Sequence, residues 1–248
     1  MTLLVIVSLA AVAASELHAA AWTDAVDKIK ALVAAGASLD AQDDNQATAL
    51  HAAASMGHVE AVAVLVAAGA HIDAQDGRQA TPLHWAANNG QAQAAAALAA
   101  AGAMIEAQDG RGLTPLHVAA SRGHSDAIKA LVTVGASLEA LGTRDMTPLH
   151  FAATSGQAAA ITLLVAAGAA VDAQTDTKLT PLHVAAFMGH ADAIKALVAA
   201  GASLEVQSEV NEMRQTPLDI VKAFDGEKGT ALLRILLDAK ASREKDEL

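Results

Sequence analysis

The sequence predicts an all-α solenoid in which short helix-turn-helix repeats stack one after another. Hydrophobic residues make up 53% of the chain but aromatic residues only 2%, and about half of the apolar side chains are Ala. Ala buries too little area to build a thick core, although it lets short helices approach closely. Two markers share one period. Thr-Pro-Leu-His or a close variant begins at Thr48, Thr81, Thr114, Thr147, Thr180 and Thr216, in steps of 33, 33, 33, 33 and 36 residues. A Gly-Ala pair keeps the same register at Gly36, Gly69, Gly102, Gly135, Gly168 and Gly201.

Each repeat contains the signals for two short helices. Thr is a good N-cap, and Pro beside it occupies the first helical position, where its missing N–H is not needed. A Gly ends this first helix, at Gly57, Gly90, Gly123, Gly156 and Gly189. The second helix carries apolar residues spaced i, i+3 and i+4, as in Ile128, Leu131 and Val132. Neither helix can bury its apolar side alone, so neighbouring repeats must stack.

These markers resemble those of the ankyrin repeat family over residues 15–241. The resemblance implies an ankyrin-repeat solenoid whose repeats combine a β-hairpin-like finger loop with two antiparallel helices, the fingers and first helices lining a concave face. Leu17–Ala20 aligns with Leu50–Ala53, and Lys240 and Asp219 replace the Gly and His of the last repeat, which suits a polar cap. We expect seven repeats, near 15–42, 43–75, 76–108, 109–141, 142–174, 175–210 and 211–241.

The finger turns depart from the family pattern. The family has Gly two residues before the Thr, where the turn needs a positive φ, and here only Gly112 complies. We therefore predict strained or differently shaped turns at the other five positions, which are Gln46, Gln79, Asp145, Lys178 and Arg214.

Both ends of the chain carry possible address signals. Residues 1–14 are apolar like a secretory signal peptide, with Val12-Ala13-Ala14 as a cleavage site but without a basic start, and they are too short to span a membrane. The polar tail 242–248 ends in the retrieval signal Lys245-Asp246-Glu247-Leu248. We expect the protein to reside in the lumen of the endoplasmic reticulum. In the alternative, residues 1–14 are an extra capping helix, the tail is accidental and the chain is a cytoplasmic ankyrin scaffold.

The composition and the motifs argue against nucleic-acid binding, cysteine-based sites and the common catalytic motifs. A formal net charge of −11 argues against nucleic-acid binding, and the absence of Cys excludes thiolate catalysis and cysteine-based zinc sites. The family resemblance gives the motif histidines a structural role, linking the Thr of their own repeat to neighbouring loop backbone; they are His51, His84, His117, His150 and His183. No zinc-protease, phosphate-loop or nucleophile-elbow motif is present. We expect no enzyme activity and no cofactor.

The candidate binding residues lie on the fingers and first helices. Arg78, Arg111 and Arg144 share one finger slot and could pair with carboxylates, or they could be solvated charges without effect. The slot before the Thr holds Leu113, Met146 and Leu179, and the ends of first helices hold Arg122, Phe187 and Met188. These residues form an interface or pack against the adjacent finger. Trp85 stands where the family has a buried Leu, so we expect it in the core.

The sequence thus predicts a non-enzymatic interaction module or adaptor that binds another protein or an extended peptide carrying acidic and apolar groups. The alternative is an inhibitor or protective factor that occludes the active site of a partner enzyme. We expect a monomer without a stable membrane span.

Overall fold

The computed structural model describes residues 2–210 and 213–246, which form two compact units. The amino-terminal unit comprises residues 1–115 and 129–136, and the carboxyl-terminal unit comprises residues 116–128 and 137–248. Helices α7 (Pro115–Arg122) and α8 (Ser125–Thr133) contain residues of both units.

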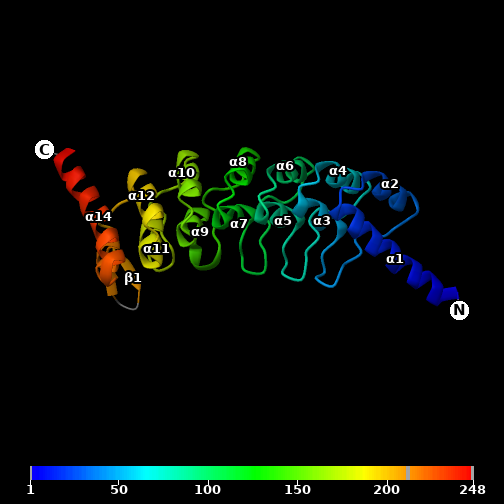
Figure 1. The fold of residues 1–248 in the computed structure, drawn as a ribbon, viewed down its shortest axis with the longest axis horizontal. Helices are drawn as coiled ribbons and strands as arrows, with labels where there is room; N and C mark the ends of the chain where they lie inside the picture. Colours follow the sequence, from blue (N-terminus) through cyan, green and yellow to red (C-terminus); the bar gives the residue numbers. More distant parts are fainter. Residues whose placement is uncertain (1, 211–212, 247–248) are drawn as a thin grey trace. The chain divides into compact units, whose positions relative to one another are not determined.

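The amino-terminal unit consists of helix pairs joined by long loops (Figure 1). The first helices of its pairs pack in one layer and the second helices in another. The first layer contains α1 (Thr2–Trp22), α3 (Ala49–Met56) and α5 (Pro82–Asn88). The second layer contains α2 (Val26–Ala34), α4 (Val59–Ala67) and α6 (Ala92–Ala100).

The carboxyl-terminal unit repeats this arrangement and adds the described strands. Its first helices include α9 (Pro148–Thr154), α11 (Pro181–Met188) and α13 (Pro217–Lys222), and its second helices include α10 (Ala158–Ala166), α12 (Ala191–Ala199) and α14 (Gly226–Asp246). One finger forms the 3-10 turn η1 (Thr143–Asp145). Another is an antiparallel hairpin of β1 (Ser208–Val210) and β2 (Met213–Gln215), in which Glu209 pairs with Arg214. The predicted all-α solenoid of stacked helical hairpins is confirmed.

The hydrophobic core is a thin layer of small side chains between the helices. In the five motifs that begin at Thr48, Thr81, Thr114, Thr147 and Thr180, the Leu and the Ala pair are fully buried, as are the inner residues of the second helices, such as Ile161 and Leu164. Gly57 and Gly189 end α3 and α11 in the left-handed conformation, with φ of 78° and 67°. Close packing of Ala therefore replaces bulk, as the composition predicts.

The motif histidines join each repeat to the next. His51 Nδ1 accepts the backbone N–H of Thr48 at 3.1 Å, and its Nε2–H donates to the carbonyl of Ala80 at 3.0 Å. The same Nε2 contact recurs at 2.8–3.0 Å within each unit, from His84 to Leu113, His117 to Met146, His150 to Leu179 and His183 to Gln215. Burial lowers the pKa of His150 to about 4, against the hydrogen bonds of nearby carbonyls, and it also lowers the pKa of His51, His84 and His183. The predicted structural role of these histidines is confirmed.

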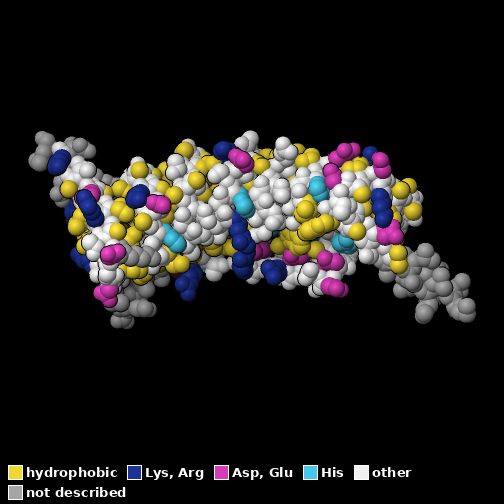
Figure 2. All heavy atoms as spheres, viewed as in Figure 1, with side chains coloured by type: hydrophobic (Ala, Val, Ile, Leu, Met, Phe, Trp, Pro, Cys, Tyr) yellow, Lys and Arg dark blue, Asp and Glu magenta, His cyan; other side chains and the backbone are white. Residues whose placement is uncertain are grey.

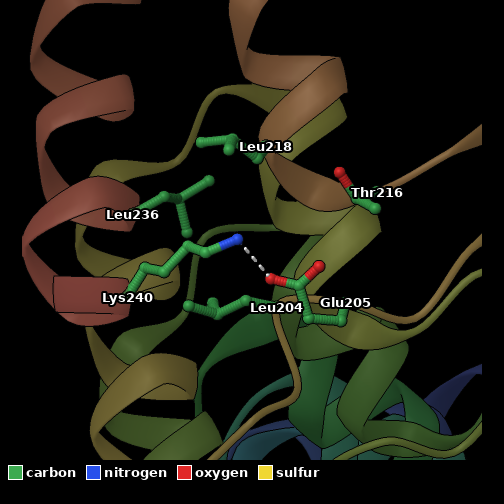
Figure 3. Close-up of a pocket in the computed structure, with 6 residues that line it drawn as sticks. All are labelled: Leu204, Glu205, Thr216, Leu218, Leu236 and Lys240. Atoms are coloured by element: carbon green, nitrogen blue, oxygen red, sulfur yellow. Dashed lines mark hydrogen bonds and ion pairs between the residues drawn. The ribbon is translucent and has the colours of Figure 1, made fainter. Parts of the chain in front are cut away.

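A loop carboxylate in four of the repeats accepts a backbone N–H of the repeat that follows it. Asp40 accepts the N–H of His71 at 2.9 Å, and Glu139 accepts that of Ala170 at 2.8 Å. In the last repeat the ammonium of Lys240 donates to Glu205 at 2.8 Å instead, beside a cavity of about 30 Å³ lined by leucines (Figure 3). Lys240 occupies the place of the helix-ending Gly, and α14 continues past it to Asp246.

The finger turns are strained where the sequence predicts it. Gln46, Gln79 and Lys178 have φ of 61°, 59° and 57°, a region that costs L-residues about 1–2 kcal/mol. In η1 both Arg144 and Asp145 are left-handed, with φ of 60° and 56°. Arg214 lies instead in the extended strand β2, so its turn is differently shaped.

The two ends of the chain continue helices of the repeats. Helix α1 runs from Thr2 to Trp22, so the predicted cleavage point after Ala14 falls inside a helix. Lys245 and Asp246 are the last residues described in α14, whereas Glu247 and Leu248 lie outside the described residues. Within the described part of the chain, no helix is long and apolar enough to cross a membrane.

The buried His150 makes stability depend on pH. Its pKa of about 4 lies below the ordinary value of 6.5, so between these values the unfolded chain binds a proton that the folded chain does not. The free energy of unfolding should fall by about 3 kcal/mol for this residue as the pH drops from 7.5 to 4. Urea unfolding followed by circular dichroism measures this loss, and His150→Leu should be less stable at pH 7.5 but lose less on acidification. An equal loss in both proteins contradicts the assignment.

Relief of finger strain gives a second test. Gln79→Gly removes a left-handed side chain and should raise the free energy of unfolding by about 0.5–1 kcal/mol. Arg214→Gly, the matched control in an extended strand, should lower it by about 0.5–1 kcal/mol. Thermal and urea unfolding measure both changes, and a loss of stability in Gln79→Gly would show that the turn is unstrained.

Candidate protein-binding surface

Aspartates build the fingers that present Arg78 and Arg111. Oδ1 of Asp109 accepts the N–H groups of Arg111 at 2.9 Å and Leu113 at 3.0 Å, and Asp76 binds Arg78 and Ala80 in the same way at 2.8 Å. Neighbouring fingers are joined by the N–H of Gly110, which donates to the carbonyl of Arg78 at 2.9 Å. Each arginine lies exposed on a loop that these hydrogen bonds hold. Figure 2 shows basic and acidic side chains interleaved along these fingers.

The two arginines differ in what holds them. Nε and Nη2 of Arg111 donate to Oδ2 of Asp109 at 3.0 and 2.8 Å. Burial alone would raise the pKa of Asp109, but hydrogen bonds from Leu113 and Arg111 outweigh it and lower the pKa. In the preceding finger, the Nε1–H of Trp85 donates a hydrogen bond to the equivalent oxygen, Oδ2 of Asp76, at 2.9 Å. Among the described residues, the Arg78 side chain therefore faces solvent without a protein hydrogen bond, whereas Arg111 is already engaged.

Two sequence expectations in this unit need correction. Leu113 is only 5% exposed, so its side chain belongs to the core and is not offered to a partner. Trp85 is half-buried rather than fully in the core, because its ring packs edge-on against His51 at 5.4 Å while its indole N–H reaches Asp76.

The fingers of the carboxyl-terminal unit are built differently. Gly142 stands where the three preceding fingers have Asp43, Asp76 and Asp109, so this position offers no carboxylate to the turn, and η1 forms with Arg144 exposed at its tip. In the next finger Lys178 Nζ lies 2.7 Å from Glu209 Oε1, and this contact lowers the pKa of Glu209. Arg122 is exposed at the end of α7. The unit thus displays basic groups on two fingers and on one helix end.

The end of α11 carries the apolar part of the surface. Its inner residues Ala185 and Ala186 are fully buried, whereas Phe187 is 42% and Met188 48% exposed. Met146 and Leu179 are half-buried, and their carbonyls accept the Nε2–H of His117 and His150. The structure therefore exposes about half of the Phe187 and Met188 side chains, and less of Met146 and Leu179.

The sequence reasoning missed an equivalent pair in the amino-terminal unit. Trp22 is 49% and Met56 38% exposed at the ends of α1 and α3. Five periods of 33 residues separate Trp22 from Phe187, and four separate Met56 from Met188. The register of the repeat was the signal that could have found them. Within the described residues, no group of three or more His, Asp or Glu side chains is placed to hold a metal ion.

Comparisons with known proteins agree with this architecture. The family profile "Ankyrin repeats (3 copies)" matches residues 17–109 and 100–175, and the profile "Ankyrin repeat" matches residues 177–209. No curated protein matches the sequence of the chain.

Two solved structures illustrate the similarity. The ankyrin repeat domain of human ASB11 is 29% identical, with a TM-score of 0.75 over 88% of this chain and 96% of that one. The ankyrin repeat domain of Bcl-3, described as a unique member of the IkappaB protein family, is 27% identical, with a TM-score of 0.74 over 88% of this chain and 97% of that one.

The unequal roles of the two finger arginines can be measured. Arg111→Met removes two hydrogen bonds to Asp109 and should lower the free energy of unfolding by about 0.5–1 kcal/mol while raising the pKa of Asp109. Arg78→Met, the matched change one finger earlier, should stay within about 0.5 kcal/mol. Urea unfolding and a carbon-detected NMR titration of Asp109 report the two effects. Equal losses for both variants would contradict the difference.

Proposed function

The chain belongs to the ankyrin repeat family, whose repeat domains generally mediate contacts between proteins, and we therefore propose that it is a non-enzymatic module that docks a partner protein on its fingers and first helices. The stacking of repeats makes the surface rigid before the partner arrives. A preformed surface loses little conformational entropy on binding.

One observation carries the proposal, the exposure of Phe187 and Met188 on α11. Gly189 ends the helix directly after them, and the rest of its inner face is buried. Large apolar side chains surrounded by polar groups mark interaction sites, and Phe and Met are enriched in interface cores. We assign these two residues as the anchor of the partner.

Exposed arginines in the same unit as the anchor residues could bind acidic groups of the partner. Arg122 and Arg144 belong to the same unit as Phe187 and are exposed on an otherwise acidic protein. Arg pairs with carboxylates through two parallel hydrogen bonds. We therefore expect a partner, or an extended segment of one, that combines an apolar side chain with nearby Asp or Glu.

Proximity labelling with the full chain in cells identifies the partner and the compartment together. Residues 1–14 and the final Lys-Asp-Glu-Leu predict the endoplasmic reticulum lumen for this experiment, with the cytoplasm as the alternative. The captured partner is then purified for direct binding measurements.

Removal of the anchor should weaken that binding. Phe187→Ala together with Met188→Ala should raise the dissociation constant about tenfold or more, because hot-spot truncations cost about 2 kcal/mol. Met104→Ala, which changes a more exposed apolar residue outside the first helices, is the control and should leave the affinity unchanged. Isothermal titration calorimetry measures both. An unchanged affinity for the double variant would refute the assigned surface.

A further inference from the structure

Helix α14 differs from the other second helices in length and in its exposed face. It spans 21 residues, whereas α10 and α12 span 9 each. One face packs into the repeat through Leu232 and Leu236. The carboxyl end of the helix, red in Figure 1, extends past α12. The added turns therefore lie beyond what closing the last repeat requires.

An exposed stripe runs along the outer side of α14. Its residues follow one another at steps of four, three, four, three and four, which places them on one helix face. They are Glu227, Ala231, Arg234, Asp238, Ala241 and Lys245, all exposed. We refer to these six residues as the α14 stripe.

The charges of the α14 stripe are self-complementary. Along the chain they read acidic, small, basic, acidic, small, basic, and an antiparallel copy brings the opposite charge to every charged position. Glu227 then meets Lys245, Arg234 meets Asp238 and Ala231 meets Ala241, each pair occurring twice. A parallel copy in register would oppose like charges at all four charged positions. A two-fold interface requires such self-complementarity.

The surroundings of the stripe leave room for a second helix. A shallow groove of about 910 Å³ separates the stripe from α12, whose Ala191 and Lys195 line the opposite wall. Alanines in the groove permit close approach of another helix. Lys195, which lies 3.1 Å from Asp192 Oδ1 of its own helix, lines the same groove as Arg234.

We propose that two copies of this chain associate through their α14 stripes, as an antiparallel helix pair with its two-fold axis near residue 236. The internal contact between Arg234 Nε and Asp238 Oδ2 is 3.7 Å long, and both side chains are highly exposed, so each accepts a second partner. The assembly departs from the monomer expected from the sequence. It also uses a surface distinct from the proposed partner anchor.

The expected dimer is weak. One helix pair buries less than the area of a standard interface, which is about 1,600 Å². The formal charge of −11 on each copy opposes association, but charges farther apart than about 8 Å are screened at physiological salt. We therefore expect a dissociation constant in the micromolar range, roughly 10–100 µM.

Charge reversal tests the pairing. Sedimentation equilibrium of the full chain should show a species of twice 25.0 kDa that grows with concentration. Arg234→Asp and Asp238→Arg should each weaken the dimer about tenfold, because each reversal places like charges together at two symmetric sites. The double variant with both reversals should restore it, with helix content checked by circular dichroism. A monomer at all concentrations, or no rescue in the double variant, overturns the proposal.

Cysteine cross-linking tests the direction of the pair. The chain contains no Cys, so introduced thiols have no competitors. Ala231→Cys combined with Ala241→Cys should give a disulfide-linked dimer under mild oxidation. Ala231→Cys alone should not, because ten residues of helix separate the two copies of position 231 by about 15 Å. Efficient linkage through the single variant would establish a parallel arrangement and overturn ours.

The two proposals fail independently. The double charge reversal should leave the affinity for the captured partner unchanged, and the changes at Phe187 and Met188 should leave sedimentation unchanged.

Discussion

The hydrogen bond from each motif histidine to the next repeat is the interaction on which the structure depends. One imidazole fixes the start of its own first helix through Nδ1 and holds the following finger through Nε2, as His51 does for Thr48 and Ala80. Because the core is mostly Ala, apolar packing alone specifies the register of the repeats poorly. The buried imidazole supplies that specificity, and its burial lowers its pKa and keeps it neutral at pH 7. Within the described residues no buried side-chain nitrogen or oxygen lacks a hydrogen-bond partner.

The sequence predicted what depends on one repeat and its copies. The period, the helix starts and stops, the histidine contacts and the strained turns at residues such as Gln79 all follow from local motifs. The solvent exposure of residues at the same position of different repeats could not be predicted. It depends on which side chains of the neighbouring repeat cover that position. Leu113 and Met146 share one slot, yet the first is buried and the second half-exposed. The hydrogen bond from Trp85 to Asp76 likewise needed the structure.

Surface variety arises in the fingers while the histidine contacts stay constant. Asp109 ties its own turn with two backbone hydrogen bonds and leaves its second oxygen to Arg111. Thr175 replaces part of this with one bond to the N–H of Leu179 at 3.1 Å, and Gly142 supplies none. Each loss changes the turn without disturbing the carbonyl that the preceding histidine binds. The repeat can therefore alter its exposed finger residues without losing its stacking.

The last repeat shows how the end of a stack creates a new surface. Asp219 replaces the histidine and still accepts the N–H and hydroxyl of Thr216, at 3.2 and 2.8 Å, but its carboxylate has no N–H to donate to a neighbouring carbonyl. Lys240 satisfies the loop carboxylate of Glu205 that another repeat would otherwise hold. Because a lysine side chain replaces a helix-ending Gly there, α14 is free to continue. This substitution thus accompanies the long helix α14, through which we propose that two copies pair.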